Sequence, residues 1–427
     1  MACLQPSATI HSHVLNRRPH TVFIDGCITA LIPLLCMKTS MTRITCSLAI
    51  VTACVLILSA SPQQAQNPSI EFKTDAQKIR VVTLVQGLDS PWSIVFLPSG
   101  DILLTERPGR LRRFSNGALQ SEPIGGLPEI QFGTHGGLLD VVLHPNFASN
   151  QLIYLSYSKG GEQGSTTAIV RGRLDGNRLV DVKDIFVADA WTKGSLNPGS
   201  RIVFDRNGML YASIGDRGPN TEPLAQDLSN HVGKIVRLYD DGRVPADNPF
   251  VGRPNAKPEI YSYGHRNPQG MTLNPETGEV WASEHGPMGG DEVNIIKRGA
   301  NYGWPVVSYG RKYSGEIISE QPFREGMEAP RFFWVPSIGI SNILFYTGDR
   351  FPMWKGNFFV TGMSGRMIQR VRIGGRGQNE RELLLNAMRQ EVRDIRQGPD
   401  GLIYLVTRQD AEHTAKSGML LRIEPVN

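Results

Sequence analysis

A short pattern that recurs six times constrains the fold of this chain more than any other feature. Each copy has an apolar strand, a turn that contains Gly with Pro, Asp or Asn, and a second apolar strand, as in residues 93–104 (SIVFLPSGDILL). The turns lie 47 to 72 residues apart. Each interval therefore holds about four short strands and a loop, which is the size of one β-propeller blade. The other copies lie at residues 139–155, 201–212, 270–281, 342–360 and 394–405.

The composition agrees with an all-β chain that is dense in turns. The 427 residues include 45 Gly and 28 Pro, and no segment shows a long helical period. We predict one six-bladed β-propeller over residues 66–427. No segment resembles an independent domain, because each blade buries its faces only against its neighbours. A pair of β-sandwiches is the alternative.

The first 65 residues are expected to lie outside this domain. Lys38 and Arg43 precede the apolar run 46–60, and a polar stretch follows it, an order typical of a secretory signal peptide at residues 37–65. Residues 1–36 then form an upstream start-site extension.

Cysteine positions and net charge exclude several kinds of site and partner. All five cysteines, at positions 3, 27, 36, 46 and 54, precede residue 66. A mature domain would therefore have no disulfide and no thiolate metal site. The net charge of +5 is small and spread along the chain, which does not favour nucleic-acid binding. We expect a periplasmic or secreted protein with no membrane span in its mature chain.

The most distinctive motifs follow the third copy of the pattern. Residues 262–270 read SYGHRNPQG, residues 283–296 read SEHGPMGGDEVNII, and residues 301–305 read NYGWP. Three carboxylates of the second motif stand among glycines and a proline, which leaves main-chain carbonyls accessible between them. Ca²⁺ favours such all-oxygen surroundings, although Gly/Pro/Asp runs also form plain turns.

These motifs resemble the signature of the soluble aldose and glucose dehydrogenases that use pyrroloquinoline quinone (PQQ), the glucose/sorbosone dehydrogenase-like propellers. The resemblance runs from about Pro91 to Pro425. It implies a quinone that is held at one end of the propeller by Ca²⁺. A histidine takes the proton of the anomeric hydroxyl while a hydride passes to the quinone. An aldose is thereby oxidised to a lactone, and a soluble electron acceptor reoxidises the cofactor.

The resemblance also assigns two calcium sites. Gly286 and Pro287 would offer carbonyls to the cofactor Ca²⁺. Glu292 and the carbonyl of Tyr302 would hold a second, structural Ca²⁺.

It further implies contacts with the cofactor and the substrate. Asp291 would lie beside both, Trp334 would form a stacking wall, and Arg393 would meet a cofactor carboxylate. Asn220 and His285 are expected to complete the cofactor site.

The chain departs from the family pattern at four positions. Asn197 stands where the family has its catalytic histidine, and an amide cannot accept a proton near neutral pH. Ser364, Glu391 and Pro219 stand where cationic partners of the cofactor are expected. Weaker PQQ binding and slow sugar oxidation would follow, and substitution of Ser364 by Lys together with Glu391 by Arg would strengthen binding.

Two histidines offer a substitute base. His135 stands where the family often has a glutamine that faces the same pocket, and His285 lies within the metal loop. Either imidazole could titrate in a useful range, although a histidine beside such a turn more often only makes hydrogen bonds.

Two other functions remain open. A diverged Ca²⁺-binding propeller without PQQ would bind carbohydrate or protein, and a metal-dependent lactonase is a third possibility. The asparagine at position 197 favours the binding module, whereas the intact motif at 283–296 favours the dehydrogenase.

Overall fold

The computed structural model describes residues 67–374, 379–408 and 416–426. The expected leader and its five cysteines lie outside these residues. Within them, no helix is long and apolar enough to cross a membrane.

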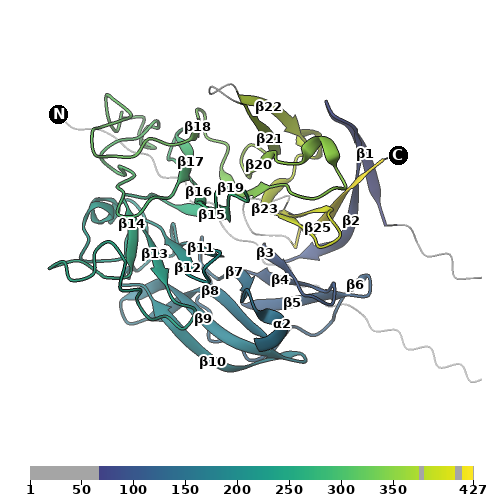
Figure 1. The fold of residues 1–427 in the computed structure, drawn as a ribbon, viewed down its shortest axis with the longest axis horizontal. Helices are drawn as coiled ribbons and strands as arrows, with labels where there is room; N and C mark the ends of the chain where they lie inside the picture. Colours follow the sequence, from purple (N-terminus) through teal and green to yellow (C-terminus); the bar gives the residue numbers. More distant parts are fainter. Residues whose placement is uncertain (1–66, 375–378, 409–415, 427) are drawn as a thin grey trace, which may run out of the picture. The chain divides into compact units, whose positions relative to one another are not determined.

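Six antiparallel sheets form the blades of a β-propeller (Figure 1). This confirms the predicted fold class. The first three sheets are β3 (Pro91–Phe96), β4 (Ile102–Glu106), β5 (Arg110–Ser115) and β6 (Ala118–Leu119); β7 (Leu138–Leu143), β8 (Leu152–Gly161), β9 (Gly164–Asp175) and β10 (Arg178–Val187); and β11 (Gly199–Phe204), β12 (Leu210–Ile214), β13 (Lys234–Leu238) and β14 (Ile260–Tyr263). The next two are β15 (Pro268–Leu273), β16 (Val280–Glu284), β17 (Asp291–Ile295) and β18 (Phe332–Trp334); and β19 (Ile340–Phe345), β20 (Phe358–Gly362), β21 (Met367–Ile373) and β22 (Asn379–Leu384).

The last blade joins the two ends of the described chain. It contains β23 (Glu391–Gln397), β24 (Ile403–Arg408) and β25 (Gly418–Pro425) together with the N-terminal strands β2 (Lys78–Leu88) and β1 (Ser69–Lys73). Strand β2 pairs with β25 in antiparallel register. The ring of blades is thus closed by main-chain hydrogen bonds, a feature that the sequence pattern did not predict.

The recurring motif forms the first two strands of every blade. The first strand of each sheet contacts the first strand of the next, and β23 returns to β3. These inner strands begin with four buried residues in most blades. Their apolar character follows from burial on both faces, and the site described below lies where several of them begin.

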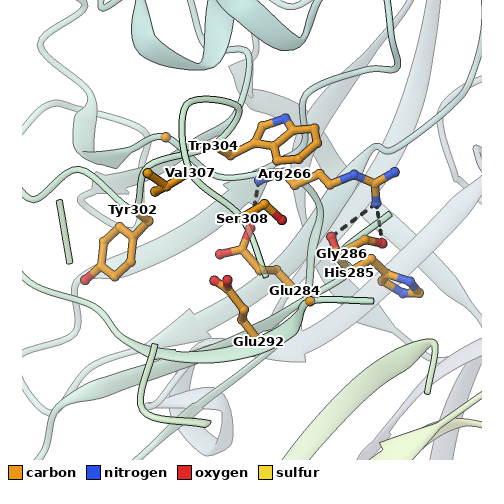
Figure 2. A pocket seen from close by; sticks show the side chains of 11 residues that line it. Arg266, Glu284, His285, Gly286, Glu292, Tyr302, Trp304, Val307 and Ser308 are labelled. Atoms are coloured by element: carbon orange, nitrogen blue, oxygen red, sulfur yellow. Dashed lines mark hydrogen bonds between the residues drawn. The ribbon is translucent and has the colours of Figure 1, made fainter. Parts of the chain in front are cut away.

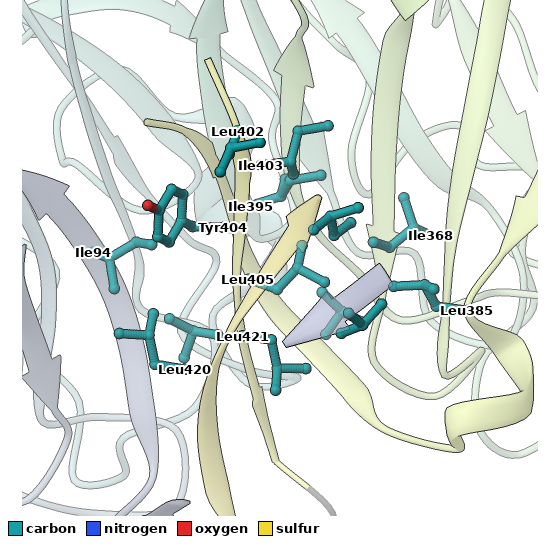
Figure 3. Packing of buried hydrophobic residues seen from close by; sticks show 14 of the residues in the cluster. Ile94, Ile368, Leu385, Ile395, Leu402, Ile403, Tyr404, Leu405, Leu420 and Leu421 are labelled. Carbon is teal, nitrogen blue, oxygen red and sulfur yellow. The ribbon is translucent and has the colours of Figure 1, made fainter. Parts of the chain in front are cut away.

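The apolar core lies between the blades. In the sixth blade, Ile395, Leu405 and Leu421 are buried in a cluster that also takes in Ile94 of the first blade and Ile368 of the fifth (Figure 3). The sixth sheet therefore packs against both neighbours at once, which explains why a blade is not stable alone.

Charged side chains tie the inner strands together at the centre. Arg201 of β11 lies 3.0 Å from Asp140 of β7 and 3.4 Å from Asp394 of β23, and all three are fully buried. Arg396 lies 3.1 Å from Asp394 and 3.3 Å from Asp140. The two acids and two arginines balance one another, as buried charges require.

Candidate active site

The largest cavity bordering the sequence-predicted residues lies where inner strands begin at one end of the propeller. Its volume is about 580 Å³, within the range of about 300–1,000 Å³ that is usual for ligand sites. The loops before β7, β11 and β15 supply one side, and the ends of β23 and β24 supply the other. The residues that line it are Arg107, Thr134, His135, Asn197, Arg266, Asn267, Gln269, His285, Tyr313, Met363, Arg393 and Arg408.

A second cavity of about 350 Å³ adjoins the first and shares His285, Tyr313, Met363 and Arg408 with it. We call the two together the cleft. The second cavity adds Gly286, Pro287, Asp291, Ser337, Gly339, Ser364 and Glu391. The fold thus brings together most of the residues that the sequence singled out.

Four guanidinium groups dominate the larger cavity, those of Arg107, Arg266, Arg393 and Arg408. Among the residues described, no acidic side chain lines this cavity. Burial, together with the charges of Arg408 and Arg107, holds the pKa of Arg393 well below its usual value. An anionic ligand would relieve this repulsion.

Glu391 borders the second cavity of the cleft, and its negative charge there is paired. Its carboxylate accepts a hydrogen bond of 2.6 Å from Nε of Arg408, and both side chains are largely buried. The two residues face each other across β23 and β24. Arg408 therefore brings a cation to the cleft from the neighbouring strand.

Asn197 lies in the large cavity and is held by its neighbours. Its Nδ2 donates to Oδ1 of Asp216 over 2.8 Å, and its Oδ1 accepts from Nδ2 of Asn267 over 3.3 Å. Asp216 also accepts from Nε1 of Trp304, and burial raises the pKa of its carboxyl. A carboxylate thus stands behind Asn197, where it would orient an imidazole at that position.

His135 lines the same cavity, but its ring is partly engaged. Its Nδ1 accepts from the main-chain N–H of Asn197 over 3.3 Å, so Nε2 carries the ring proton. Burial and the charges of Arg107 and Arg393 lower its pKa to about 4. His135 is therefore a neutral hydrogen-bond donor at physiological pH, and this tautomer does not suit a base at Nε2.

His285 borders both cavities of the cleft. Its Nε2 is buried without a hydrogen-bond partner in the structure. Burial lowers its pKa to about 4, and only the carboxylate of Asp291 acts in the opposite direction. The neutral ring leaves a polar atom available to a ligand.

Asp291 fixes the loop that follows β16. Its Oδ1 accepts from the N–H of Gly286, and its Oδ2 accepts from the N–H groups of Ile338 and Ile340 over 2.8 and 3.0 Å. Because both oxygens are engaged by main chain, Asp291 positions the Gly286–Pro287 turn. Gly286 is required there, since a Cβ atom would lie 2.2 Å from the carbonyl oxygen of Gly289.

The oxygens of this region gather as a cation site requires. Figure 2 shows the carboxylates of Glu284 and Glu292 close together, with Arg266 donating to the carbonyls of His285 and Gly286. They border a void of about 10 Å³, which Tyr302 and Ser308 also line. Burial and Glu284 raise the pKa of Glu292 to about 8.

The donor set fits Ca²⁺ through carbonyls as well as carboxylates. Among the residues described, no group of three or more His, Cys, Asp and Glu side chains could hold a metal ion. Nδ2 of Asn294 donates to Glu284 over 2.8 Å and to Glu292 over 3.2 Å, and so holds the two carboxylates together. Glu292 and the carbonyl groups of the loop are the residues that would hold the ion.

Two sequence-predicted contacts lie outside the cleft. Trp334 is buried against the fifth blade, where its Nε1 donates to Gln369 and the guanidinium of Arg381 covers its ring at 5.0 Å. Asn220 lies with Pro219 in an exposed turn. Neither Trp334 nor Asn220 lines the cleft, and Tyr313 supplies its aromatic side chain instead.

Several residues of the cleft were missed from the sequence. Asn267 and Gln269 lie within the motif at 262–270 and enter together at the start of β15, whereas Arg107 follows β4 of another blade. No local motif reveals that Arg107 converges with them. Asp216, two residues beyond the end of β12, contacts Asn197 only through the fold.

Comparisons with known proteins agree with this architecture. Residues 88–421 match the glucose/sorbosone dehydrogenase family. The chain is 40% identical to the aldose sugar dehydrogenase YliI of Escherichia coli, over 82% of this chain and 94% of that protein.

Solved structures give the same result. The apo form of the soluble aldose sugar dehydrogenase of E. coli superposes with a TM-score of 0.77 at 38% identity, over 82% of this chain and all of that one. The PQQ-bound aldose sugar dehydrogenase of Streptomyces coelicolor has a TM-score of 0.66 at 27% identity, again over 82% of this chain and all of that one. The resemblance seen in the sequence is confirmed: the chain belongs to the glucose/sorbosone dehydrogenase family.

Proposed function

We propose that this protein is a quinoprotein dehydrogenase that oxidises the anomeric carbon of an aldose to a lactone with PQQ as the acceptor. The observation that carries this proposal is the convergence of four arginines on a cleft whose larger cavity has no acidic lining among the described residues. PQQ is a flat polyanion, and guanidinium groups are its natural partners. The PQQ-bound relative from S. coelicolor supports this assignment.

The residues of the cleft divide into two roles. Arg393 and Arg408 would hold carboxylates of the cofactor, and Gly286 and Pro287 would hold its Ca²⁺. Bound PQQ would take the hydride of the sugar C1–H bond, while the proton of the anomeric hydroxyl leaves to the protein or to water. Asn197 can orient that hydroxyl by hydrogen bonds but cannot take its proton.

A soluble electron acceptor would reoxidise the reduced cofactor after each turnover. The apolar run at 46–60 after Lys38 and Arg43 supports export, so the protein would act in the periplasm or outside the cell.

Equilibrium binding tests this function. Calcium-loaded protein is titrated with PQQ, and the quenching of tryptophan fluorescence is followed. We expect saturable, calcium-dependent binding that Arg393→Gln weakens and that the control Arg381→Gln, outside the cleft, leaves unchanged. Absence of calcium-dependent binding would favour the carbohydrate- or protein-binding module.

A further inference from the structure

We propose that a groove beside the cleft is a subsite for a second sugar unit that carries a carboxylate, so that the preferred substrate is an acidic disaccharide or a longer acidic sugar. This inference rests on the proposed function, because it names the substrate class of the same site. The groove lies between residues 131–134, the hairpin at 161–165 and residues 193–195, and its volume is about 370 Å³.

The groove continues the cleft. Thr134 lines both. Two segments of the chain pass from the groove to the cleft within two residues, from Gly133 to His135 and from Ser195 to Asn197. A sugar that is linked to the unit held at Asn197 would therefore extend into the groove.

The walls suit a sugar ring. Phe132 is 44% exposed, and the guanidinium of Arg107 lies 5.3 Å from its ring centroid. An exposed aromatic face packs against the apolar face of a pyranose. Gln131, Thr134 and Ser195 offer the polar groups that a sugar's hydroxyls need.

The charge of the groove is positive. Lys193 stands at its rim. Arg217 lies beneath its floor, with Nη2 3.3 Å from Oγ of Ser165, while its Nε and Nη1 are buried without partners. Its neighbour Asp216 accepts hydrogen bonds from Asn197, Gly218 and Trp304 and offsets the charge of Arg217 only by its proximity, not by a direct contact.

No acid offsets these cations within the groove. None of the described lining residues is acidic. Glu162, the nearest acid along the hairpin, is exposed at its tip and does not line the groove. Both the cation beneath the floor and the cation at the rim therefore favour an anionic sugar over a neutral one.

Gly194 allows a sharp test. It lines the groove, and a Cβ atom there would meet no other atom within 4 Å. Gly194→Glu would place a carboxylate in the groove without disturbing the fold, and Gly194→Gln is its uncharged match.

The experiment compares cellobiouronate, in which a glucuronate precedes glucose, with cellobiose, which has the same linkage and no charge. With PQQ- and calcium-loaded protein, we expect kcat/KM for cellobiouronate to exceed that for cellobiose by about ten-fold. Gly194→Glu should abolish this preference and leave glucose oxidation unchanged. Gly194→Gln should lower kcat/KM for the two disaccharides by the same factor. Lys193→Gln should reduce the preference for cellobiouronate several-fold.

Calorimetric binding of the two disaccharides to calcium-loaded protein separates the possible failures. If no aldose is oxidised but cellobiouronate still binds more tightly than cellobiose, in a manner that Gly194→Glu removes, the subsite stands and the proposed reaction fails. If glucose is oxidised and the two disaccharides behave alike in both assays, the reaction stands and the subsite is overturned. Equal binding in a protein without activity overturns both.

Discussion

Asn197 shows how much a single residue decides in this cleft. Its amide bonds to Asp216 and Asn267, so the carboxylate that would orient a histidine is in place. Its φ of 39° is positive, a conformation in which Asn, Asp and His are enriched among residues other than glycine. The backbone can therefore accept a histidine at this position.

We expect Asn197→His to raise PQQ-dependent aldose oxidation by roughly 10²-fold, because a positioned base contributes at least that much. Initial rates with glucose measure the change. The gain should disappear in the double variant Asn197→His with Asp216→Asn. A rate that stays at the wild-type level, in a protein that binds PQQ normally, would show that another group already takes the proton.

The paired charges of Glu391 and Arg408 are expected to control PQQ affinity. Arg408→Gln should weaken PQQ binding about ten-fold, since it removes a charge-assisted contact. Glu391→Arg should also weaken binding, because it places a guanidinium beside Arg408 and Arg393 without a carboxylate. The exchange Glu391→Arg with Arg408→Glu restores the pair and should recover affinity. Tighter binding by Glu391→Arg alone would contradict this account.

The sequence revealed the motif residues but not their partners. The positions of Gly286, Pro287, Asp291 and His285 around the cleft follow from one contiguous stretch. The pairing of Glu391 with Arg408 depends on the register of β23 and β24, which shifts between Val392 and Asp394. The burial of Trp334 likewise depends on which face of β18 meets the fifth blade.

At the scale of elements, the hairpin of β16 and β17 brings two acidic side chains together. Glu284 ends β16 and Glu292 lies at the start of β17, and the strands pair these two carboxylates directly. Two adjacent acids in a partly buried site repel each other unless a proton or a cation intervenes. The hairpin therefore depends on what occupies that site.

Glu292 makes the stability of the calcium-free protein depend on pH. Its pKa is about 8 in the fold, against 4.5 ordinarily, so between these values the folded state holds a proton that the unfolded chain has released. Stability should therefore fall as the pH rises through this window. Calcium bound at the ionised carboxylate would restore stability, most at the high end of this window.

Melting temperatures with calcium and with chelator, from pH 5 to pH 9, measure this effect. Glu292→Gln should remove both the decline with pH and most of the response to calcium. The exposed Glu276→Gln is the control and should keep both. A calcium response that is equal in Glu292→Gln and wild type would place the ion elsewhere.

The six strand pairs could be recognised from the sequence because the two strands of each pair are close in the chain. Each pair is also joined by a turn that contains Pro, Asp or Asn. Closure by β1 and β2 could not, because these strands lie more than 300 residues from β25 along the chain. Only the geometry of the ring brings them together.

At the largest scale, the six blades of the described domain form a ring whose centre is charged. Asp140, Asp394, Arg201 and Arg396 connect the inner strands of three blades, and the last blade joins both ends of the described chain. The cleft is assembled from most of the blades, so its geometry depends on closure of the ring.

Removal of one central acid should cost much more than removal of a surface acid. Asp140→Ala leaves Arg201 and Arg396 with less compensation, which we expect to lower the free energy of unfolding by about 3 kcal/mol. The exposed pair of Asp349 with Lys355 gives the control, and Asp349→Ala should cost less than about 1 kcal/mol. Urea unfolding of both variants measures the difference. Equal losses of unfolding free energy in the two variants would show that the central ion pairs do not stabilise the ring.

Reductive titration tests the central claim most directly. Protein loaded with PQQ and calcium is kept free of oxygen, an aldose is added, and the absorbance of the bound quinone is followed. The account predicts that the quinone bleaches with one equivalent of sugar oxidised per cofactor, slowly in the wild type and faster in Asn197→His. A bound quinone that no aldose reduces in either protein would contradict it.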